Sequence, residues 1–241
     1  MDFYTTLVGF FQNGGPFMYP IAVVLGVGFA IAIERFVYLA KEMRANRRDY
    51  DRIIPMLRQK RMREVAEMAR KSTSAVGRIV ADGLARMNAS RRRQDLEYAM
   101  EEQLLEVLPS IERRTPYLAT FANIATLLGL LGTIIGLIAA FTAVANADPA
   151  EKATLLSQSI SIAMNTTAFG LMVAIPLLLV HSMLQSKTSA IVESLEIAVV
   201  KFLNLMEEGA STQQKHAVAT SGARGAGAGA GAGAAAKAKK A

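Results

Sequence analysis

Three long apolar stretches limit what this chain can fold into more than any other feature. They cover residues 16–40, 117–145 and 160–184 of the 241-residue sequence, and no Asp, Glu, Lys or Arg lies in the centre of any of them. A helix needs roughly 20 predominantly apolar residues to cross the hydrocarbon core of a bilayer. Strand-like alternation is absent from residues 41–116. The sequence therefore predicts an all-α membrane protein with three transmembrane helices.

The positive charges set the expected orientation. Residues 41–115 contain 18 of the 27 Lys and Arg, whereas residues 146–158 contain only Lys152 and none precedes Arg35. Short loops rich in Lys and Arg stay in the cytoplasm. We therefore expect an outward amino terminus and a cytoplasmic carboxy terminus. The net charge of +7 follows from this asymmetry, so we expect no nucleic-acid site.

The remaining segments are assigned from their composition and spacing. Charged and apolar residues alternate at helical spacing in the segment before the second span, with expected breaks near Pro55, at residues 71–74 and at residues 88–90, and a bend at Pro109 or Pro116. The low-complexity Gly/Ala/Lys tail cannot bury a core. The predicted segments are an external interfacial segment (1–15), a cytoplasmic helical domain (41–116), a short external loop (146–159), a cytoplasmic helical extension (185–208) and a disordered tail (209–241).

Small and weakly polar residues form a stripe on the second span. In TLLGLLGTIIGLIAAF, residues 126–141, the positions Thr126, Gly129, Thr133 and Gly136 follow steps of three and four and share one helix face. Small residues at such spacing let transmembrane backbones approach closely. From spacing alone, close helix packing is the favoured interpretation.

The third span carries a second stripe of this kind, in which Thr166 or Thr167 precedes Gly170. If the two spans run antiparallel, Thr133 and Thr167 lie at depths within roughly one helical turn of each other. Two hydroxyl groups could then face a common space. Neither hydroxyl can hold a charge.

No expected span carries its own central ionisable residue. Glu34 and Arg35 lie at the cytoplasmic end of the first span, where long side chains reach toward the interface, and we assign them an anchoring role. A chain that handled protons alone would be expected to carry an intramembrane ionisable group, so this one would have to borrow it. There is no cysteine, metal-ligand cluster, paired carboxylate or nucleophile with a base in the sequence, so we expect neither an enzyme nor a metal site.

Three segments resemble the MotA/TolQ/ExbB proton channel family: ERF at 34–36, LLGLLGTIIGLIAAF at 127–141 and TTAFGLMVAIP at 166–176. The three-span layout is similar to its ExbB and TolQ branch. The resemblance implies a homopentameric ring in the bacterial inner (cytoplasmic) membrane, with a periplasmic amino terminus. It also implies a central dimer of a single-span partner like ExbD, TolR or MotB, whose membrane aspartate takes and releases the ion. Further partners implied are membrane lipids and an accessory protein similar to TonB or TolA, or a motility protein.

The resemblance also assigns roles to individual residues. Thr133 and Thr167 occupy the positions of the family's pore-facing threonines, and Pro176 that of its proline in the third span. The expected ion pathway comprises Thr133, Thr167, Thr166, Thr126 and Asn165. The expected helix-packing residues are Gly129, Gly132, Gly136, Gly170 and Pro176.

Two departures from the family leave the ion open. The branch usually carries a glutamate where this chain has Ile162, and a proline where it has Thr126. Hydroxyl and amide oxygens are reasonable Na⁺ ligands, so Na⁺ stands beside the favoured H⁺, and no other cofactor is expected. The expected function is the ion-channel subunit of a motor that energises outer-membrane transport, envelope maintenance or motility. The alternative is a non-conducting membrane scaffold whose basic domain recruits a cytoplasmic partner.

Overall fold

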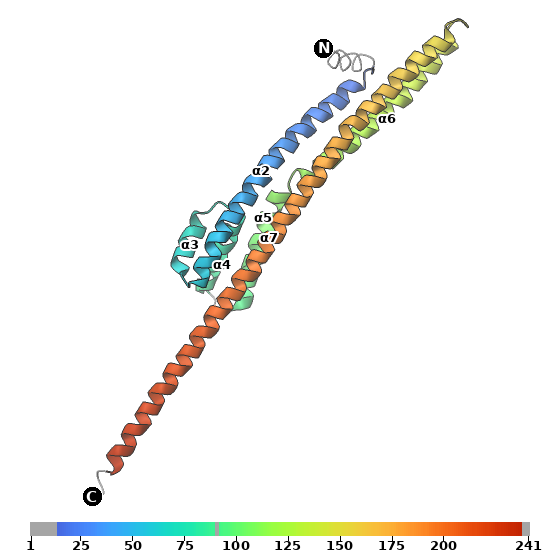
Figure 1. Cartoon of the computed structure of the whole chain (residues 1–241). Coiled ribbons are helices and arrows are strands. Elements are labelled where there is room, and N and C mark those ends of the chain that lie inside the picture. Colours follow the sequence, from blue (N-terminus) through green and yellow to red (C-terminus); the bar gives the residue numbers. More distant parts are fainter. Residues whose placement is uncertain (1–13, 90–91, 238–241) are drawn as a thin grey trace. The chain divides into compact units, whose positions relative to one another are not determined.

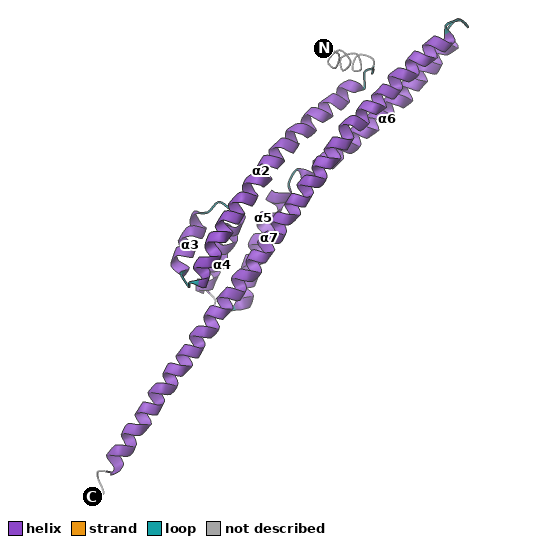
Figure 2. Cartoon of the chain, in the orientation of Figure 1, coloured by secondary structure: helices purple, strands orange, loops and turns teal. Residues whose placement is uncertain are grey.

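A computed structural model of the chain describes residues 14–89 and 92–237 (Figure 1). Among these residues every regular element is a helix (Figure 2). The helices are α2 (Met18–Arg58), α3 (Met62–Lys71), α4 (Ala75–Ala89), α5 (Arg93–Glu112), α6 (Thr115–Ala145) and α7 (Lys152–Lys237). Three helical stretches in the described residues are long and apolar enough to cross a membrane, namely Met18–Arg58, Arg93–Ala145 and Lys152–Glu208.

The described residues divide into two compact units. We call residues 14–43 and 108–192 the apolar unit, and residues 44–107 together with α7 from Glu193 onward the charged unit. The three expected spans lie in the apolar unit, and most of the expected cytoplasmic domain lies in the charged unit. Residues 1–13 of the expected interfacial segment are outside the described residues.

The apolar unit exposes many large hydrophobic side chains, while small residues and some large ones, such as Leu39 and Leu118, are buried. Phe29, Leu127, Ile138 and Leu179 are each between 61% and 63% exposed, whereas the alanines between its helices are almost fully buried. A soluble protein rarely exposes an apolar surface of this extent. This surface is the one expected for helices covered by lipid.

The junction between α5 and α6 falls between two prolines. Pro109 lies inside α5, and Pro116 lies in the first turn of α6, where its missing N–H removes no helical hydrogen bond. Arg114, between the two helices, has a φ of +67°. The sequence analysis expected a bend at one of the prolines. The break instead occurs at Arg113 and Arg114.

Two other helix boundaries also differ from expectation. The helix α2 continues through Pro55 and ends at Arg58, and Lys60, in the turn that follows, has a φ of +59°. Burial of Leu57 explains why packing keeps the last turn helical despite the proline. The connection between α6 and α7 is only residues 146–151, shorter than the expected loop 146–159. The carbonyl of Asp148 already accepts from the backbone N–H of Lys152 at 3.2 Å, so the turn that starts α7 forms early.

The charged unit has a core of large side chains. Phe202 of α7 and Met100 of α5 are fully buried. A Cβ added to Gly83 of α4 would lie 3.0 Å from Met100 and 3.5 Å from Phe202, so the three helices meet there. Seven residues before Met100, Arg93 pairs with Glu207, which follows Phe202. These two contacts show that α5 and α7 run antiparallel in this unit.

Buried polar groups connect α2 to the start of α4 in the charged unit. The Ser74 hydroxyl accepts from the N–H of Gly77 at 3.0 Å, and the Asn46 side-chain oxygen accepts from the N–H of Val76 at 3.2 Å. Both contacts satisfy amides that the first turn of a helix leaves without partners. Asp49 is also buried and accepts a hydrogen bond from Ser72. The polar residues therefore fix where α4 begins, and residues 72–74 form the expected break.

The structure differs from the predicted disordered tail. The helix α7 continues to Lys237, and residues 238–241 lie outside the described residues. Extending an existing helix adds one backbone hydrogen bond per residue, and Ala has the highest helix propensity of all residues. The alanines that alternate with glycine in the tail are thus compatible with continued helix. The side chains beyond Glu208 are outside the described part of the chain.

Candidate functional site

Glycines bring the backbones of α6 and α7 into contact in the apolar unit. A Cβ added to Gly170 would lie 2.7 Å from the carbonyl oxygen of Ala125, and one added to Gly129 would lie 3.2 Å from the Cα of Thr167. Side chains at these positions would therefore collide with backbone atoms. Only residues without a Cβ allow this approach, which Figure 1 shows as two helices side by side.

Two further glycines of α6 continue the same contact. A Cβ on Gly132 would lie 2.4 Å from the Cγ2 of Thr166, and a Cβ on Gly136 would lie 2.9 Å from the Cβ of Ala163. The small-residue stripes predicted on the second and third spans thus meet each other within one chain. Much of the stripe on α6 is used for packing inside the protomer.

The two threonines of α7 bond to different neighbours. Thr167 donates its hydroxyl hydrogen to the carbonyl oxygen of Gly129 at 2.8 Å, across the contact with α6. The hydroxyl of Thr166, which is buried, lies 2.5 Å from the carbonyl oxygen of Gly14 and 3.0 Å from that of Ile162 in its own helix. Both threonines therefore help to hold the helices of the apolar unit together.

Thr126 and Thr133 of α6 make no such contact between helices in the described structure. Thr126 donates to the carbonyl of Ala122 at 3.1 Å and Thr133 to that of Leu130 at 2.6 Å, both within α6. Thr126 is exposed and Thr133 is partly exposed. A hydroxyl that donates to its own helix keeps its oxygen available as an acceptor. These two oxygens can therefore accept a hydrogen bond from a group outside the protomer.

Among the described residues, Thr133 and Thr167 do not share a hydrogen-bond partner. Thr133 bonds within α6, whereas Thr167 bonds to Gly129, one turn before Thr133 on the same helix. The glycines occupy the centre of the face of α6 that packs on α7, and Thr126 and Thr133 lie at its edge. The sequence analysis suggested that the hydroxyl groups of Thr133 and Thr167 face a common space. Such a space would have to lie at this edge.

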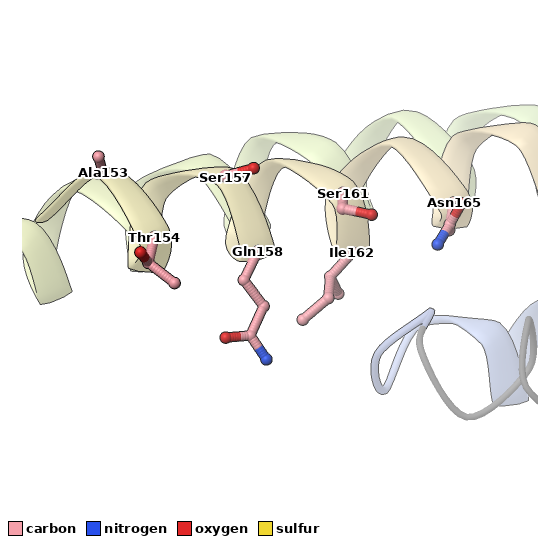
Figure 3. A pocket seen from close by; sticks show the side chains of 7 residues that line it. All are labelled: Ala153, Thr154, Ser157, Gln158, Ser161, Ile162 and Asn165. Carbon is pink, nitrogen blue, oxygen red and sulfur yellow. The ribbon is translucent and has the colours of Figure 1, made fainter. Parts of the chain in front are cut away.

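Asn165 lies in an open groove on α7 that the sequence analysis did not identify. The groove has a volume of about 650 Å³. Figure 3 shows the side chains of Thr154, Gln158, Ile162 and Asn165 directed to the same side of the helix. The described residues that line it are Ala153, Thr154, Ser157, Gln158, Ser161, Ile162 and Asn165.

Five of the seven residues that line the groove carry a hydroxyl or amide group, and none of the side chains is charged. The polar residues recur at steps of three and four from Thr154 to Asn165, a spacing that was visible in the sequence. Thr154, Ser157, Gln158 and Ser161 are therefore candidate functional residues that reasoning from the family motifs missed. Their signal was a polar helix face in front of the motif rather than inside it.

Pro176 lies inside α7, eleven residues beyond Asn165. Proline has no backbone N–H, so the carbonyl of Met172 lacks its usual helical donor. The helix nevertheless continues through this position. Pro176 therefore leaves one carbonyl in the apolar unit open to another donor.

Glu34 and Arg35 of α2 both contact the junction between α5 and α6. Glu34 pairs with Arg114, and both side chains are partly exposed. Arg35 is only 3% exposed, and its guanidinium donates to the carbonyl oxygens of Ser110 and Ile111 at the end of α5. The sequence analysis expected Arg35 to reach toward the interface. Instead it is buried, because it satisfies carbonyls that the last turn of α5 leaves without partners.

The comparison with known families agrees with these observations. The family model described as the MotA/TolQ/ExbB proton channel family matches residues 71–197. This range includes α6, the groove on α7 and both glycine stripes. The chain belongs to this family.

Individual relatives place it in the ExbB and TolQ branch. The chain is 29% identical over 82% of its length to a Methanothermobacter thermautotrophicus homologue of the biopolymer transport protein ExbB, covering 69% of that protein. It is 28% identical over 66% of its length to the biopolymer transport protein ExbB of Pseudomonas putida, covering 51% of it. It is 30% identical over 49% of its length to the Tol-Pal system protein TolQ of Haemophilus influenzae, covering 51% of it. Membership and the three apolar helices together make the chain a multi-pass membrane protein.

Proposed function

We propose that this chain is the ion-channel subunit of a bacterial inner-membrane motor that uses the ion motive force. The observations that carry the proposal are two sets of uncharged polar side chains, Thr126 and Thr133 on α6 and the lining of the groove on α7, on helices otherwise covered by apolar side chains. Polar groups are costly in lipid unless they are satisfied. A surface of this kind is suited to a polar partner or an ion rather than to acyl chains.

The ionisable group of the motor is supplied by a partner. In the proposed complex, a homopentamer surrounds a dimer of a single-span protein whose membrane aspartate faces the threonines. An ionised carboxylate is destabilised in a low-dielectric site, and hydrogen-bond donors favour the ionised form. A hydroxyl such as that of Thr133 can turn from the carbonyl of Leu130 to the aspartate when the proton leaves. The transmembrane potential and the pH gradient acting on this charge then drive movement of the partner.

The groove on α7 is the proposed external route to this site. From Thr154 to Asn165 it extends about 16 Å, at a rise of ~1.5 Å per residue. Hydroxyl and amide oxygens can replace part of the hydration shell of a hydronium ion or Na⁺. Protons remain the favoured ion. The route begins next to the short loop 146–151, which is external in the proposed orientation.

The names of the relatives are the basis for proposing which process the motor drives. The names of two relatives refer to biopolymer transport and that of a third to the Tol-Pal system. We propose that this chain energises a process of the outer envelope through an accessory protein similar to TonB or TolA. Motility is the further process that the family includes.

The proposal is tested by ion flux. The full chain is reconstituted into liposomes with a single-span partner that carries a membrane aspartate, and proton flux is measured with a trapped pH dye under an imposed potential. Thr133→Val keeps the volume and removes the hydroxyl. We expect about a ten-fold loss of flux, which corresponds to one hydrogen bond worth about 1.4 kcal/mol in the rate-limiting state.

Thr142→Val is the matched control. Thr142 is exposed and donates to the carbonyl of Ile138 at 2.9 Å, so it makes the same kind of bond within α6 as Thr133 does. It lies beyond the contact with Ala163 and should change the flux little. Equal flux in wild type and Thr133→Val would contradict the proposed role of Thr133.

A non-conducting scaffold is the second candidate. It is favoured by the use of Gly129, Gly132 and Gly136 for packing within one chain, which is what small residues do in any membrane helix bundle. Absence of flux in the presence of the partner, together with normal assembly, would support the scaffold.

A further inference from the structure

One face of α2 in the charged unit is basic. Arg44, Arg47, Arg48 and Arg52 are all exposed, and their spacing places them on the same side of the helix. The opposite side is buried and carries Asn46, Asp49 and Ile53. The arginines therefore point away from the core of their own unit. We call these four residues the basic face.

One face of α5 is acidic and also partly apolar. Glu101, Glu102 and Glu106 are exposed. On the same face, Tyr98 and Leu105 are 67% and 65% exposed. Helix α5 contains six Asp or Glu, and Arg93 is its only basic residue. The opposite side is buried through Leu96, Met100 and Val107. We call Tyr98, Glu101, Glu102, Leu105 and Glu106 the acidic face.

The exposure of Tyr98 and Leu105 is unusual for their surroundings. The other exposed residues of their face are charged, unlike the lipid-type surface of the apolar unit. Large apolar side chains exposed within a charged surface mark sites of protein interaction. Tyrosine is also enriched in interfaces. The acidic face thus has the composition of an interface rather than that of a solvated surface.

The two faces match in spacing and in charge. Positions 44, 47, 48 and 52 have the same steps as positions 98, 101, 102 and 106, so each face extends about 12 Å along its helix. In the described part of the chain, no ion pair joins one face to the other; Arg48 pairs with its neighbour Asp49 at 3.5 Å. Their complementary charges are therefore available to a second molecule.

Contacts with α7 show that the faces also match in height. Lys201 of α7 donates to the Tyr50 hydroxyl at 2.7 Å, and Tyr50 lies between Arg48 and Arg52 along α2, at the height of the basic face. Glu207, six residues after Lys201, pairs with Arg93 of α5. Because α5 and α7 run antiparallel, Ala99, six residues after Arg93, lies level with Lys201 within about one helical turn. Tyr50 and Ala99 thus lie at similar heights along the helix axes. If copies of the chain are arranged around an axis parallel to these helices, the basic face of one copy lies level with the acidic face of the next.

We propose that the acidic face binds the basic face of a second copy of this chain. Two different surfaces meet in such a contact, so one copy keeps its basic face free and the other its acidic face. Further copies can therefore add, and they form a ring if the rotation closes. Tyr98 and Leu105 supply buried apolar area and a ring on which an arginine can stack. The charges set the register and exclude contacts between two faces of the same kind. This inference rests on the proposed function in so far as the channel is a ring of identical subunits.

Cysteine crosslinking tests the contact directly, because the chain contains no cysteine. The full-length variant Arg48→Cys/Glu102→Cys is treated in membranes with a short bismaleimide. We expect a ladder of covalent oligomers, severalfold more abundant than with either single variant. The control is Arg48→Cys/Glu67→Cys, because Glu67 is an exposed glutamate on α3 outside both faces. It should give no ladder. A ladder with the control but none with the test pair would overturn the proposal.

A charge exchange provides the second test. Glu101→Arg/Glu102→Arg and Arg47→Glu/Arg48→Glu should each reduce severalfold the fraction of oligomer seen by native mass spectrometry of the detergent-purified chain. Combining all four substitutions should restore it. Failure of the combination to restore the oligomer, when both pairs reduce it, would contradict the contact.

The two proposals fail in different ways. If the wild-type chain forms a conducting ring but the test pair does not crosslink and the charge reversals have no effect, the proposed function stands and the contact is wrong. If the wild-type chain is monomeric in membranes and gives no crosslinks, both are wrong. Crosslinks and rescue without flux would support the contact and reject the ion channel.

Discussion

The contact between α6 and α7 in the apolar unit differs from the helix contacts of the charged unit. In the apolar unit, α6 and α7 touch through Gly129 and Gly170, and large side chains such as Leu127 and Ile138 lie outside, although others, such as Leu118 and Leu184, are buried. In the charged unit, the large side chains of Met100 and Phe202 are buried between helices. Burial of apolar area stabilises helix contacts in water, but it gives no such advantage in lipid, where close packing and hydrogen bonds must act instead. The same chain therefore relies on its smallest residues at the contact between α6 and α7, and on large side chains at the contact between α5 and α7.

The largest expected effect is the loss of a large core side chain in the charged unit. Phe202→Ala should destabilise that unit by roughly 3–5 kcal/mol, the usual cost of removing a buried phenyl ring. Hydrogen exchange of peptides from α4 and α5, measured by mass spectrometry, should accelerate strongly. Val200→Ala is the control, since Val200 is more than half exposed on the same helix. Unchanged exchange in Phe202→Ala would mean that the contact at Gly83 does not hold these helices together.

The next largest effect comes from the opposite change. Adding one methyl group, rather than removing a large side chain, should disrupt the apolar unit. Gly170→Ala would place a Cβ 2.7 Å from the backbone oxygen of Ala125, which cannot move alone. Overpacking of this kind costs about 1–3 kcal/mol. We expect a lower thermal unfolding temperature in detergent and a smaller yield of oligomer.

The control for this substitution is Gly26→Ala in α2, since no atom lies within 4 Å of the added Cβ. Alanine should stabilise the helix there by up to about 1 kcal/mol, because Gly is a poor helix former. Equal effects of the two substitutions would show that helix propensity, rather than backbone contact, decides stability in the apolar unit.

Asp49 adds a pH-dependent contribution that is specific to the charged unit. Burial by itself would raise the pKa of its carboxyl, but hydrogen bonds from Ser72 and Ser74 and the nearby Arg48 outweigh it and lower the pKa. A lowered pKa in the folded state means that the stabilisation is present above the ordinary carboxyl pKa. It is lost as the pH falls through the folded-state value.

The variant Asp49→Asn should therefore lose roughly 1.5–3 kcal/mol at neutral pH, the range for a hydrogen bond to a charged group. Its unfolding temperature should depend less on pH in the acidic range than that of the wild type. Thermal unfolding between neutral and acidic pH measures both. A wild type and variant with parallel pH profiles would show that Asp49 does not titrate with unfolding.

The helix-rich character of the chain followed from the sequence, and so did the helix break at residues 72–74. Hydropathy and spacing act locally, so they identify a span without knowledge of its neighbours. The burial of Arg35 could not be predicted, because it depends on the carbonyls of Ser110 and Ile111, more than 70 residues away. The end of α2 beyond Pro55 likewise depends on the packing of Leu57.

The candidate site was predictable only in part for a related reason. Spacing placed Gly129 and Thr133 on one face, but a helix face is broad, and the contact with α7 uses its centre while Thr133 lies at the edge. Motif resemblance also drew attention to Thr166 and Thr167 and away from the polar residues before them. Ser157 and Ser161 lie outside the segments that carry the resemblance, and their common groove with Asn165 brings them together.

The smallest expected effect concerns Glu34, at the junction of α5 and α6. Its partner Arg114 is partly exposed, and exposed ion pairs contribute little to stability because water screens them. Glu34→Gln should therefore leave the unfolding temperature in detergent nearly unchanged. Arg35→Gln should lower it clearly, since Arg35 is buried and holds the carbonyls at the end of α5. The pair of variants thus separates an exposed contact from a buried one at adjacent positions. If Glu34→Gln lowered the unfolding temperature as much as Arg35→Gln, the ion pair with Arg114 would be a main structural contact, and the difference between buried and exposed charge would not hold at this junction.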